Sequence, residues 1–234
     1  MSAIERRERL IVALDVPSAA EARALVERLG PAARFFKIGL ELAMAPGYFE
    51  LVDWLTARGN RVFADLKLFD IPETVARTVA NLRGRGITFL TVHGNQSMMQ
   101  AAAKEKGDLK ILAVTALTSL DRGDLDDLGF SCDVERLVLS RARRAMEAGC
   151  DGVISSGLEA ARLKSEFKER LLVVTPGIRP VENRADDQKR TVDVAQAFAN
   201  GADYIVVGRP IRQAAEPRAA AEAIQATIAT IFPA

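Results

Sequence analysis

Charged residues lie at the ends of several short apolar segments. Burying a charge there costs free energy, so a functional or structural reason for each charge is expected. The residues in this position are Asp15, Lys37, Asp65 and Lys67, and Asp70 follows Lys67 three residues later. Asp65 and Lys67 are two residues apart, so an extended chain points both side chains to one face. A carboxylate beside an ammonium group can hold a proton donor in place and stabilise charge that develops during a reaction. The competing interpretation is an ion-pair network that only closes one end of the fold, since buried pairs need compensation.

A second group of polar residues follows the last two apolar segments. It consists of Thr175-Pro176-Gly177-Ile178-Arg179-Pro180 and Val207-Gly208-Arg209-Pro210. Gly208 permits close approach of a ligand to the backbone, and Arg209 presents a fork of N–H donors that matches phosphate oxygens. An ordinary glycine turn followed by a solvated arginine is the alternative. Together, a charged cluster and an anion-binding cluster predict a small phosphorylated substrate.

Eight short apolar segments rich in β-branched residues recur along the chain, each followed by a longer amphipathic segment. They are Leu10–Asp15, Arg34–Gly39, Arg61–Leu66, Thr88–His93, Lys110–Ala116, Gly152–Ser155, Leu171–Thr175 and Tyr204–Gly208. Near-continuous apolar runs, in place of strict alternation, are typical of strands buried on both faces of a parallel sheet. A spacing of roughly 20 to 40 residues indicates repeated strand–helix units.

Helix signals fill the intervals between these segments. Ser18 is an expected helix N-cap, Glu21 completes a capping box with it, and Gly30 ends that helix. Pro72 suits the first turn of another helix, where its missing N–H costs little. The further helical ranges that the pattern predicts are Ala22–Leu29, Val134–Ala148 and Ala214–Ile231.

Repeated strand–helix units without a linker predict an α/β protein with one domain over residues 1–234, folded as a single (β/α)8 TIM barrel. An open, doubly wound sheet is the alternative. No GxGxxG motif follows the first strand, which argues against dinucleotide binding. In a barrel, the carboxyl ends of the strands carry the chemistry, and the loops after the last two strands commonly bind phosphate. Both polar clusters fall in these places.

Composition excludes several function classes. The chain of 234 residues has 32 basic and 31 acidic side chains, a balance that argues against broad nucleic-acid or membrane-surface binding. It has no apolar stretch long enough to span a membrane and no signal-like N-terminus, so we expect a cytoplasmic location. Two separate cysteines, Cys132 and Cys150, and the single His93 make a zinc site implausible, and we expect no metal.

The residues around Lys67 resemble a family signature. Residues 65–74 read Asp-Leu-Lys-Leu-Phe-Asp-Ile-Pro-Glu-Thr, similar to the DxKxxDIPxT motif of orotidine 5′-phosphate decarboxylases. Further matches run in register along the whole chain at Leu14-Asp15, Phe36-Lys37-Ile38-Gly39, Leu117-Thr118-Ser119, Pro176-Gly177-Ile178-Arg179, Asp187-Gln188-Lys189-Arg190 and Gly208-Arg209-Pro210. Phe69 and Glu73 stand where relatives often have His and Asn, at positions not expected to carry chemistry.

The resemblance implies a decarboxylase without cofactors, which forms UMP and carbon dioxide in the last step of de novo pyrimidine synthesis. In such an enzyme Lys67 would donate a proton to ring carbon six after carbon dioxide leaves. Asp65 would lie beside the substrate carboxylate, Lys37 would contact ribose while holding Asp65, and Asp15 would bind a ribose hydroxyl. Carbon dioxide loss leaves a vinyl carbanion with no π system to delocalise its electron pair, so the site must stabilise localised charge electrostatically.

The resemblance also implies a homodimer, in which Asp70 and Ile71 of each subunit complete the partner's site. Gln188, Gly208 and Arg209 would bind the phosphate, and residues 181–189 would form a lid. The substrate contacts implied in total are Asp15, Lys37, Ile71, Thr74, Thr118, Ser119, Pro176, Arg179, Gln188, Gly208 and Arg209, with Ser119 nearest the pyrimidine.

The DxKxxD part of the motif alone leaves a rival open. Sugar-phosphate decarboxylases and aldolases of the same suprafamily carry it too, and they would use the aspartates to hold Mg²⁺. Ile71-Pro72 together with Gln188 favours the nucleotide decarboxylase. A barrel that binds nucleotides without turnover is a further alternative, which the intact set of Asp65, Lys67 and Asp70 makes implausible.

Overall fold

The protein forms a closed barrel of eight parallel strands that pair in chain order, with β8 returning to pair with β1. The computed structural model describes residues 4–179 and 191–233. The strands are β1 (Leu10–Ala13), β2 (Phe35–Gly39), β3 (Arg61–Leu68), β4 (Ile87–His93), β5 (Lys110–Val114), β6 (Gly152–Ile154), β7 (Leu172–Thr175) and β8 (Tyr204–Val207). The predicted (β/α)8 barrel is confirmed, and the open doubly wound alternative is wrong.

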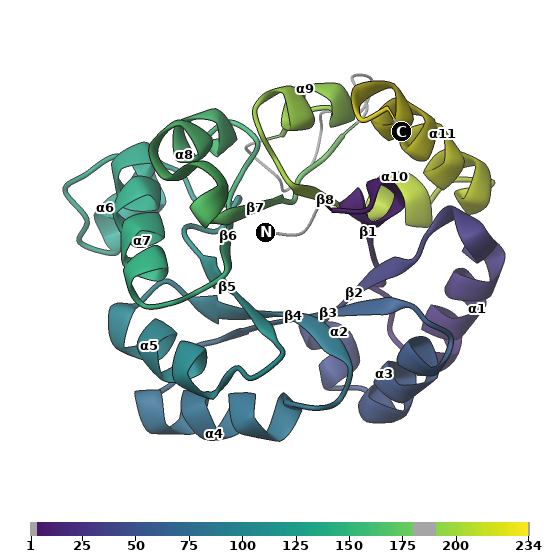
Figure 1. The fold of residues 1–234 in the computed structure, drawn as a ribbon, viewed down its shortest axis with the longest axis horizontal. Coiled ribbons are helices and arrows are strands. Elements are labelled where there is room, and N and C mark those ends of the chain that lie inside the picture. The colour runs from purple at the N-terminus through teal and green to yellow at the C-terminus, as the bar shows by residue number, and fades with distance from the viewer. Residues whose placement is uncertain (1–3, 180–190, 234) are drawn as a thin grey trace.

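The helices form a ring outside the strands, and α11 lies between α9 and α1 to close it (Figure 1). Their bounds are α1 (Ala19–Leu29), α2 (Leu40–Ala43), α3 (Tyr48–Ala57), α4 (Pro72–Leu82), α5 (Gln96–Glu105), α6 (Arg122–Asp127), α7 (Val134–Glu147), α8 (Ala160–Phe167), α9 (Val194–Ala199), α10 (Arg209–Arg212) and α11 (Pro217–Ile231). Ser18 caps α1 by accepting a hydrogen bond from the Glu21 backbone N–H, and Gly30 ends it with φ of 52°. The last helix begins at Pro217, three residues later than expected.

Side chains of the strands alternate between two hydrophobic clusters. Ile11 and Ala13 of β1 belong to a cluster inside the barrel, whereas Leu10 and Val12 belong to the larger cluster beneath the helices. Aromatic rings fill the interior, where the Phe89 ring lies 5.1 Å from those of Phe35 and Tyr204, measured between centroids. Burial on both faces explains why the strands read as unbroken apolar runs.

Strand β3 departs from regular pairing just before it ends. Ala64 pairs with Leu90 and Leu68 pairs with Val92, so three residues, 65–67, oppose the single residue Thr91 of β4. Lys67 has φ of 46°, in the left-handed region that most side chains avoid. The expectation of a fully extended chain between Asp65 and Lys67 is therefore wrong, because a bulge interrupts the strand.

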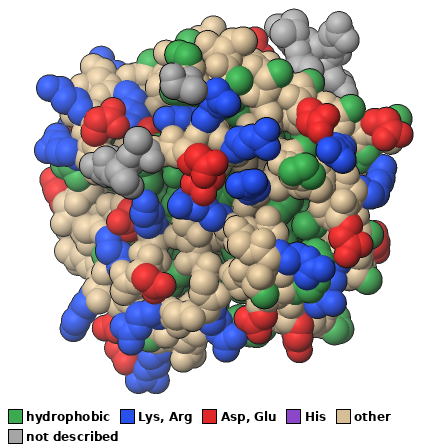
Figure 2. Space-filling view, turned by 45° about the vertical axis from the view of Figure 1, so that its right-hand side comes forward, with side chains coloured by type: hydrophobic (Ala, Val, Ile, Leu, Met, Phe, Trp, Pro, Cys, Tyr) green, Lys and Arg blue, Asp and Glu red, His purple; other side chains and the backbone are tan. Residues whose placement is uncertain are grey.

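Acidic and basic side chains are interspersed on the face of the molecule in Figure 2, with neither sign forming a continuous field. No helix among the described residues is long and apolar enough to cross a membrane.

Candidate active site

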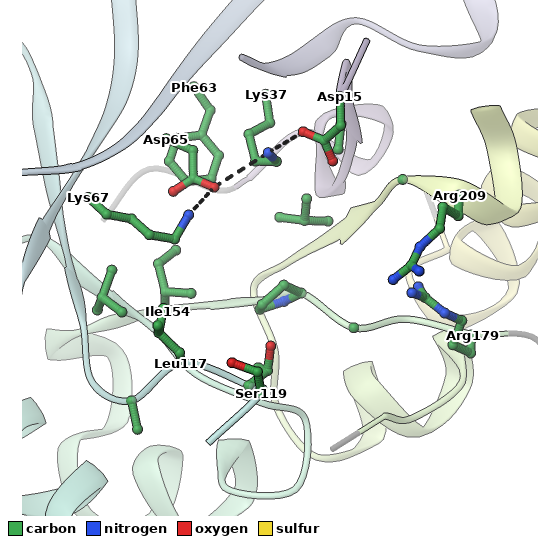
Figure 3. A pocket seen from close by; sticks show the side chains of 18 of the residues that line it. Asp15, Lys37, Phe63, Asp65, Lys67, Leu117, Ser119, Ile154, Arg179 and Arg209 are labelled. Carbon is green, nitrogen blue, oxygen red and sulfur yellow. Dashed lines mark hydrogen bonds and ion pairs between the residues drawn. The ribbon is translucent and has the colours of Figure 1, made fainter. Parts of the chain in front are cut away.

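A cavity of about 490 Å³ opens at the carboxyl ends of the strands. This volume lies within the range typical of small-molecule sites. Its walls are formed by Ala13, Asp15, Lys37, Phe63, Asp65, Lys67, Val114, Ala116, Leu117, Thr118, Ser119, Ile154, Pro176, Gly177, Arg179, Val206, Gly208, Arg209 and Arg212. In Figure 3 the carboxylate and ammonium groups lie toward the top of the cavity, two arginines at its right, and Leu117 and Ser119 at its bottom.

One wall of the cavity is a chain of alternating charges contributed by β2, β3 and the turn after β1. Lys37 Nζ lies 2.8 Å from Asp15 Oδ1 and 3.4 Å from Asp65 Oδ2. Lys67 Nζ lies 2.8 Å from the same Asp65 oxygen. Lys37, Asp65 and Lys67 meet as their positions at the ends of neighbouring strands predict, and Asp15 joins them through Lys37. Asp15 itself lies two residues beyond the end of β1 and not within the strand.

The surroundings fix the protonation of the two most buried groups. Burial would raise the pKa of Asp65, but the charges of Lys37 and Lys67 outweigh it and hold that pKa below its ordinary value. Burial would likewise lower the pKa of Lys37, but Asp65 and Asp15 outweigh it and raise that pKa. Asp65 is therefore a carboxylate and Lys37 an ammonium over the neutral range.

Exposure separates the roles that these side chains can take. The Lys37 and Asp65 side chains are 12% and 10% exposed, whereas those of Lys67 and Asp15 are 31% and 45% exposed. Lys67 can therefore present its ammonium group to a molecule in the cavity, and Asp15 can accept a hydrogen bond from one. Lys37 and Asp65 are held mainly by their neighbours.

The opposite wall is built on the segments that follow β7 and β8. Arg179 is buried and donates to the Ile178 carbonyl at 2.9 Å, and Arg209 opens the short helix α10. The two guanidinium groups converge in Figure 3. A Cβ atom at Gly208 would lie in ordinary van der Waals contact, 3.5 Å from the Ala13 side chain and 3.6 Å from Asp15 Oδ2, so this glycine lies beside the turn that carries Asp15.

The structure brings most, but not all, of the predicted site residues to this cavity. Thr118, Ser119 and Pro176 line it with the residues described above. Asp70, Ile71 and Thr74 do not, although they belong to the signature; all three are exposed outside the cavity of their own chain. The Asp70 carboxylate accepts a hydrogen bond of 2.6 Å from the Ile71 N–H. Gln188 and the predicted lid, 181–189, lie outside the described residues.

Sequence reasoning missed several wall residues. Arg212 lies one helical turn after Arg209, so both face the cavity from α10, and this spacing was a usable signal. Phe63, Ile154 and Val206 line the cavity as members of the cluster inside the barrel. Nothing in their residue types distinguishes them from ordinary core residues.

Across residues 4–179 and 191–233, no group of three or more His, Cys, Asp or Glu side chains is placed to hold a metal ion. His93 at the end of β4 lies outside the cavity wall and packs against the Phe69 ring, 4.9 Å between centroids. Burial together with the charges of Arg141 and Lys67 lowers the pKa of His93, which favours a neutral ring.

Comparisons with known proteins identify the family of the chain. The model of the orotidine 5′-phosphate decarboxylase / HUMPS family matches residues 8–224. The chain is 64% identical to an orotidine 5′-phosphate decarboxylase of Methylococcus capsulatus, over 96% of this chain and 93% of that protein. It is 51% identical to the protein of the same name from Xanthomonas euvesicatoria, over 97% and 94% of the two chains.

A solved structure shows the same architecture. The crystal structure of orotidine 5′-phosphate decarboxylase from Lactobacillus acidophilus superposes with a TM-score of 0.83 at 35% identity, covering 94% of this chain and 99% of that one. Because the family model, the relatives and the fold agree, the chain is an enzyme, a carboxy-lyase, and belongs to the orotidine 5′-phosphate decarboxylase / HUMPS family.

Proposed function

We propose that this enzyme decarboxylates orotidine 5′-monophosphate to UMP, the last step of de novo pyrimidine synthesis, without a metal or an organic cofactor. The single observation that carries this proposal is the Lys67 ammonium group. It lies 2.8 Å from Asp65 on the cavity wall, and its side chain is 31% exposed. A fixed cation at this place can stabilise a carbanion and protonate it.

The charges of the cavity match the two ends of the substrate. Arg179 and Arg209 face the four-residue charged wall across the space in Figure 3 and would bind the phosphate. The substrate base would then reach Lys67, with Ser119 near the pyrimidine. The ribose would lie between these ends, where Asp15 and Lys37 can bind its hydroxyl groups. Gln188, outside the described residues, is proposed as a further phosphate ligand.

The proposed reaction uses only side chains of the protein. The bond between ring carbon six and the carboxylate breaks, carbon dioxide leaves, and the electron pair stays on carbon six. The Lys67 ammonium group stabilises this pair and then donates a proton to it. The neutral amine regains a proton from solvent. Asp65 holds Lys67 through this sequence and lies close to where the substrate carboxylate would be.

We propose that the active enzyme is a homodimer in which Asp70 and Ile71 enter the partner's site. In their own chain both residues lie outside the cavity, although they adjoin Lys67 in sequence. Four large hydrophobic side chains on the segments that follow β2 and β3 are exposed: Leu40, Met44, Phe69 and Ile71. Such a group is typical of an interface. Thr74, exposed in the first turn of α4, would join the same contact.

Mixing two inactive variants tests the shared site. Lys67→Ala and Asp70→Ala should each lose turnover as homodimers. A heterodimer of the two contains one site with both native residues, so an equal mixture should regain about a quarter of wild-type activity. No recovery after subunit exchange, shown by mass spectrometry of the mixed dimer, would overturn the contribution from the partner.

The rival reaction on a sugar phosphate would require the aspartates to bind Mg²⁺. In the structure both Asp15 and Asp65 are already paired with Lys37, and Asp65 with Lys67 as well. Two ammonium groups beside these carboxylates oppose a divalent cation at the same place. The named relatives favour the nucleotide reaction too.

Product analysis tests the proposed reaction directly. Purified enzyme incubated with orotidine 5′-monophosphate should give equal amounts of UMP and carbon dioxide, measured by chromatography and trapped label. Orotidine, which lacks the phosphate, should react far more slowly, because Arg179 and Arg209 would have no phosphate to bind. Turnover of a sugar phosphate in place of the nucleotide would overturn the proposal.

We also propose that residues 1–234 form one domain and act in the cytoplasm. The closed barrel and the family match to residues 8–224 support one domain. The role in nucleotide metabolism supports the location.

A further inference from the structure

Three neighbouring strands place a polar residue two positions after a phenylalanine that points into the barrel. In β2 the pair is Phe35 and Lys37, and in β3 it is Phe63 and Asp65. In β4 it is Phe89 and Thr91. Side chains alternate along a strand, so all three polar residues point inward one layer above the aromatic rings. Lys37 and Asp65 belong to the charged wall, whereas Thr91 has no assigned role.

Thr91 lies opposite the bulge that places Lys67. It is the single residue of β4 facing residues 65–67 of β3, and it is fully buried. The backbone of Lys67 has φ of 46° there, a conformation that persists only where the surroundings enforce it. A residue at this position can therefore hold both the strand and the side chains that emerge from it.

The Thr91 hydroxyl makes two hydrogen bonds, one to each end residue of the bulge, Asp65 and Lys67. Its oxygen accepts a hydrogen bond of 2.9 Å from the Lys67 backbone N–H. The same hydroxyl donates to Asp65 Oδ1 at 2.9 Å. The other oxygen of that carboxylate, Oδ2, faces both ammonium groups, at 2.8 Å for Lys67 and 3.4 Å for Lys37. One hydroxyl thus fixes the rotation of the carboxylate and the position of the lysine backbone.

We infer that Thr91 is a positioning residue for the decarboxylation, acting through its hydroxyl to hold Asp65 and the backbone of Lys67 in their reactive arrangement. It does not touch the cavity, so it acts only through these two residues. The inference rests on the roles proposed above for Asp65 and Lys67. The two hydrogen bonds of the Thr91 hydroxyl set the position of the proton donor and not the binding of the phosphate. Their loss should therefore lower kcat and leave KM nearly unchanged.

Thr91→Val and Thr91→Ser form a matched pair for the test. Valine keeps the shape of threonine but removes the hydroxyl, and serine keeps the hydroxyl but removes the methyl group. With orotidine 5′-monophosphate we expect Thr91→Val to lower kcat about tenfold to a hundredfold, with KM within about threefold of wild type. Thr91→Ser should keep kcat within about threefold of wild type.

Thr115→Val controls for the loss of any buried barrel hydroxyl. Thr115 is also fully buried, and its hydroxyl donates to the Ile154 carbonyl at 2.9 Å, outside the Asp65 network. This variant should lower the melting temperature but leave kcat unchanged. If Thr91→Val retained wild-type kcat, or if Thr91→Ser lost as much as Thr91→Val, the inference would be overturned.

A second pair keeps the test decisive if Thr91→Val does not fold. Thr91→Ala and Thr91→Ser differ by one hydroxyl group, and neither adds volume to the core. The same loss of kcat is expected for alanine and the same retention for serine; equal kcat in the two would overturn the inference. Lys67→Ala, assayed alongside, separates the two proposals: if it stays active the proposed role of Lys67 fails, whatever the Thr91 variants do.

Discussion

Charged side chains cluster at both ends of the barrel, but the two ends use them differently. At the amino ends of the strands, Asp151 Oδ2 accepts hydrogen bonds of 2.9 Å from both the Ile111 N–H and Lys106. Asp203 Oδ2 accepts a hydrogen bond of 2.8 Å from the Val173 N–H and forms an ion pair of 2.8 Å with Lys164. Each carboxylate there ties a strand backbone to an ammonium group.

At the carboxyl ends of the strands, the Asp65 carboxylate is bound by side chains: Lys37, Lys67 and Thr91. One of its ammonium partners, Lys67, is left facing a cavity. An ion-pair network that only closes one end of the fold, the competing interpretation of the charged residues, therefore describes the amino end of the barrel. The carboxyl end has the form of a preorganised site, in which charged groups are fixed in position before a ligand binds.

Removing one lysine from each end should give opposite results. Lys67→Ala should lower turnover of orotidine 5′-monophosphate by at least about a thousandfold, because both charge stabilisation and the proton donor are lost. Lys106→Ala should keep turnover within about twofold but lower the free energy of unfolding by about 1–3 kcal/mol. Steady-state kinetics and urea unfolding measure both effects. Equal losses of activity in the two variants would remove the distinction between the ends.

The arginines on the wall opposite the charged side chains should contribute to substrate binding and, through the binding energy, to the rate of the reaction. Arg209→Ala should raise KM strongly and lower kcat/KM by about two to four orders of magnitude, since the binding energy of the phosphate also serves the distant reacting group. Arg212→Ala, one turn further along α10, should show a smaller loss of the same kind. Kinetics at varied substrate concentration measure this; only a several-fold loss for Arg209→Ala would contradict the phosphate role.

Disturbing the amino end should affect folding alone. Asp151→Asn keeps the shape of the side chain but removes the charge that holds Lys106, so we expect a loss of about 1–3 kcal/mol in the free energy of unfolding. For a chain of this size that corresponds to a fall of about 2 to 12 °C in Tm. Calorimetry checks the change. A fall in kcat at unchanged Tm would show that this end also serves the reaction.

The smallest effect should be a pH dependence of stability that comes from Asp65. Its pKa is lowered in the folded protein because Lys37 and Lys67 outweigh burial, so its contribution to stability is present above the unfolded pKa of about 3.9. That contribution is lost as the pH falls through the folded pKa. Asp65→Asn should therefore lose less stability than wild type on acidification, as measured by unfolding between neutral pH and the most acidic pH at which both proteins fold. Identical acid profiles would contradict the lowered pKa.

The barrel and its charged wall were predictable because they follow from local signals. All eight predicted strands exist, with bounds within two residues of those observed. The meeting of Lys37 with Asp65 follows from the shared edge of neighbouring parallel strands. The bulge at Lys67 was not predictable, because no glycine marks its left-handed backbone. Thr91 was missed because a threonine inside an apolar strand is ordinary, and only its place opposite the bulge distinguishes it.

The signature residues beyond Lys67 show another limit of sequence reasoning. A motif places Asp70, Ile71 and Thr74 near the site in sequence, whereas in the structure the turn into α4 and the first turn of that helix carry them away from the cavity of their own chain. Whether such residues serve a second subunit depends on a contact between chains, which leaves no periodic pattern along one chain.

The most direct test of the central claim is turnover of orotidine 5′-monophosphate by purified wild-type enzyme in excess EDTA, followed by the loss of substrate absorbance. If the Asp15–Lys37–Asp65–Lys67 wall is sufficient for the chemistry, the rate in EDTA should equal the rate with added magnesium. Loss of activity in EDTA that magnesium restores would contradict a reaction carried by these side chains alone.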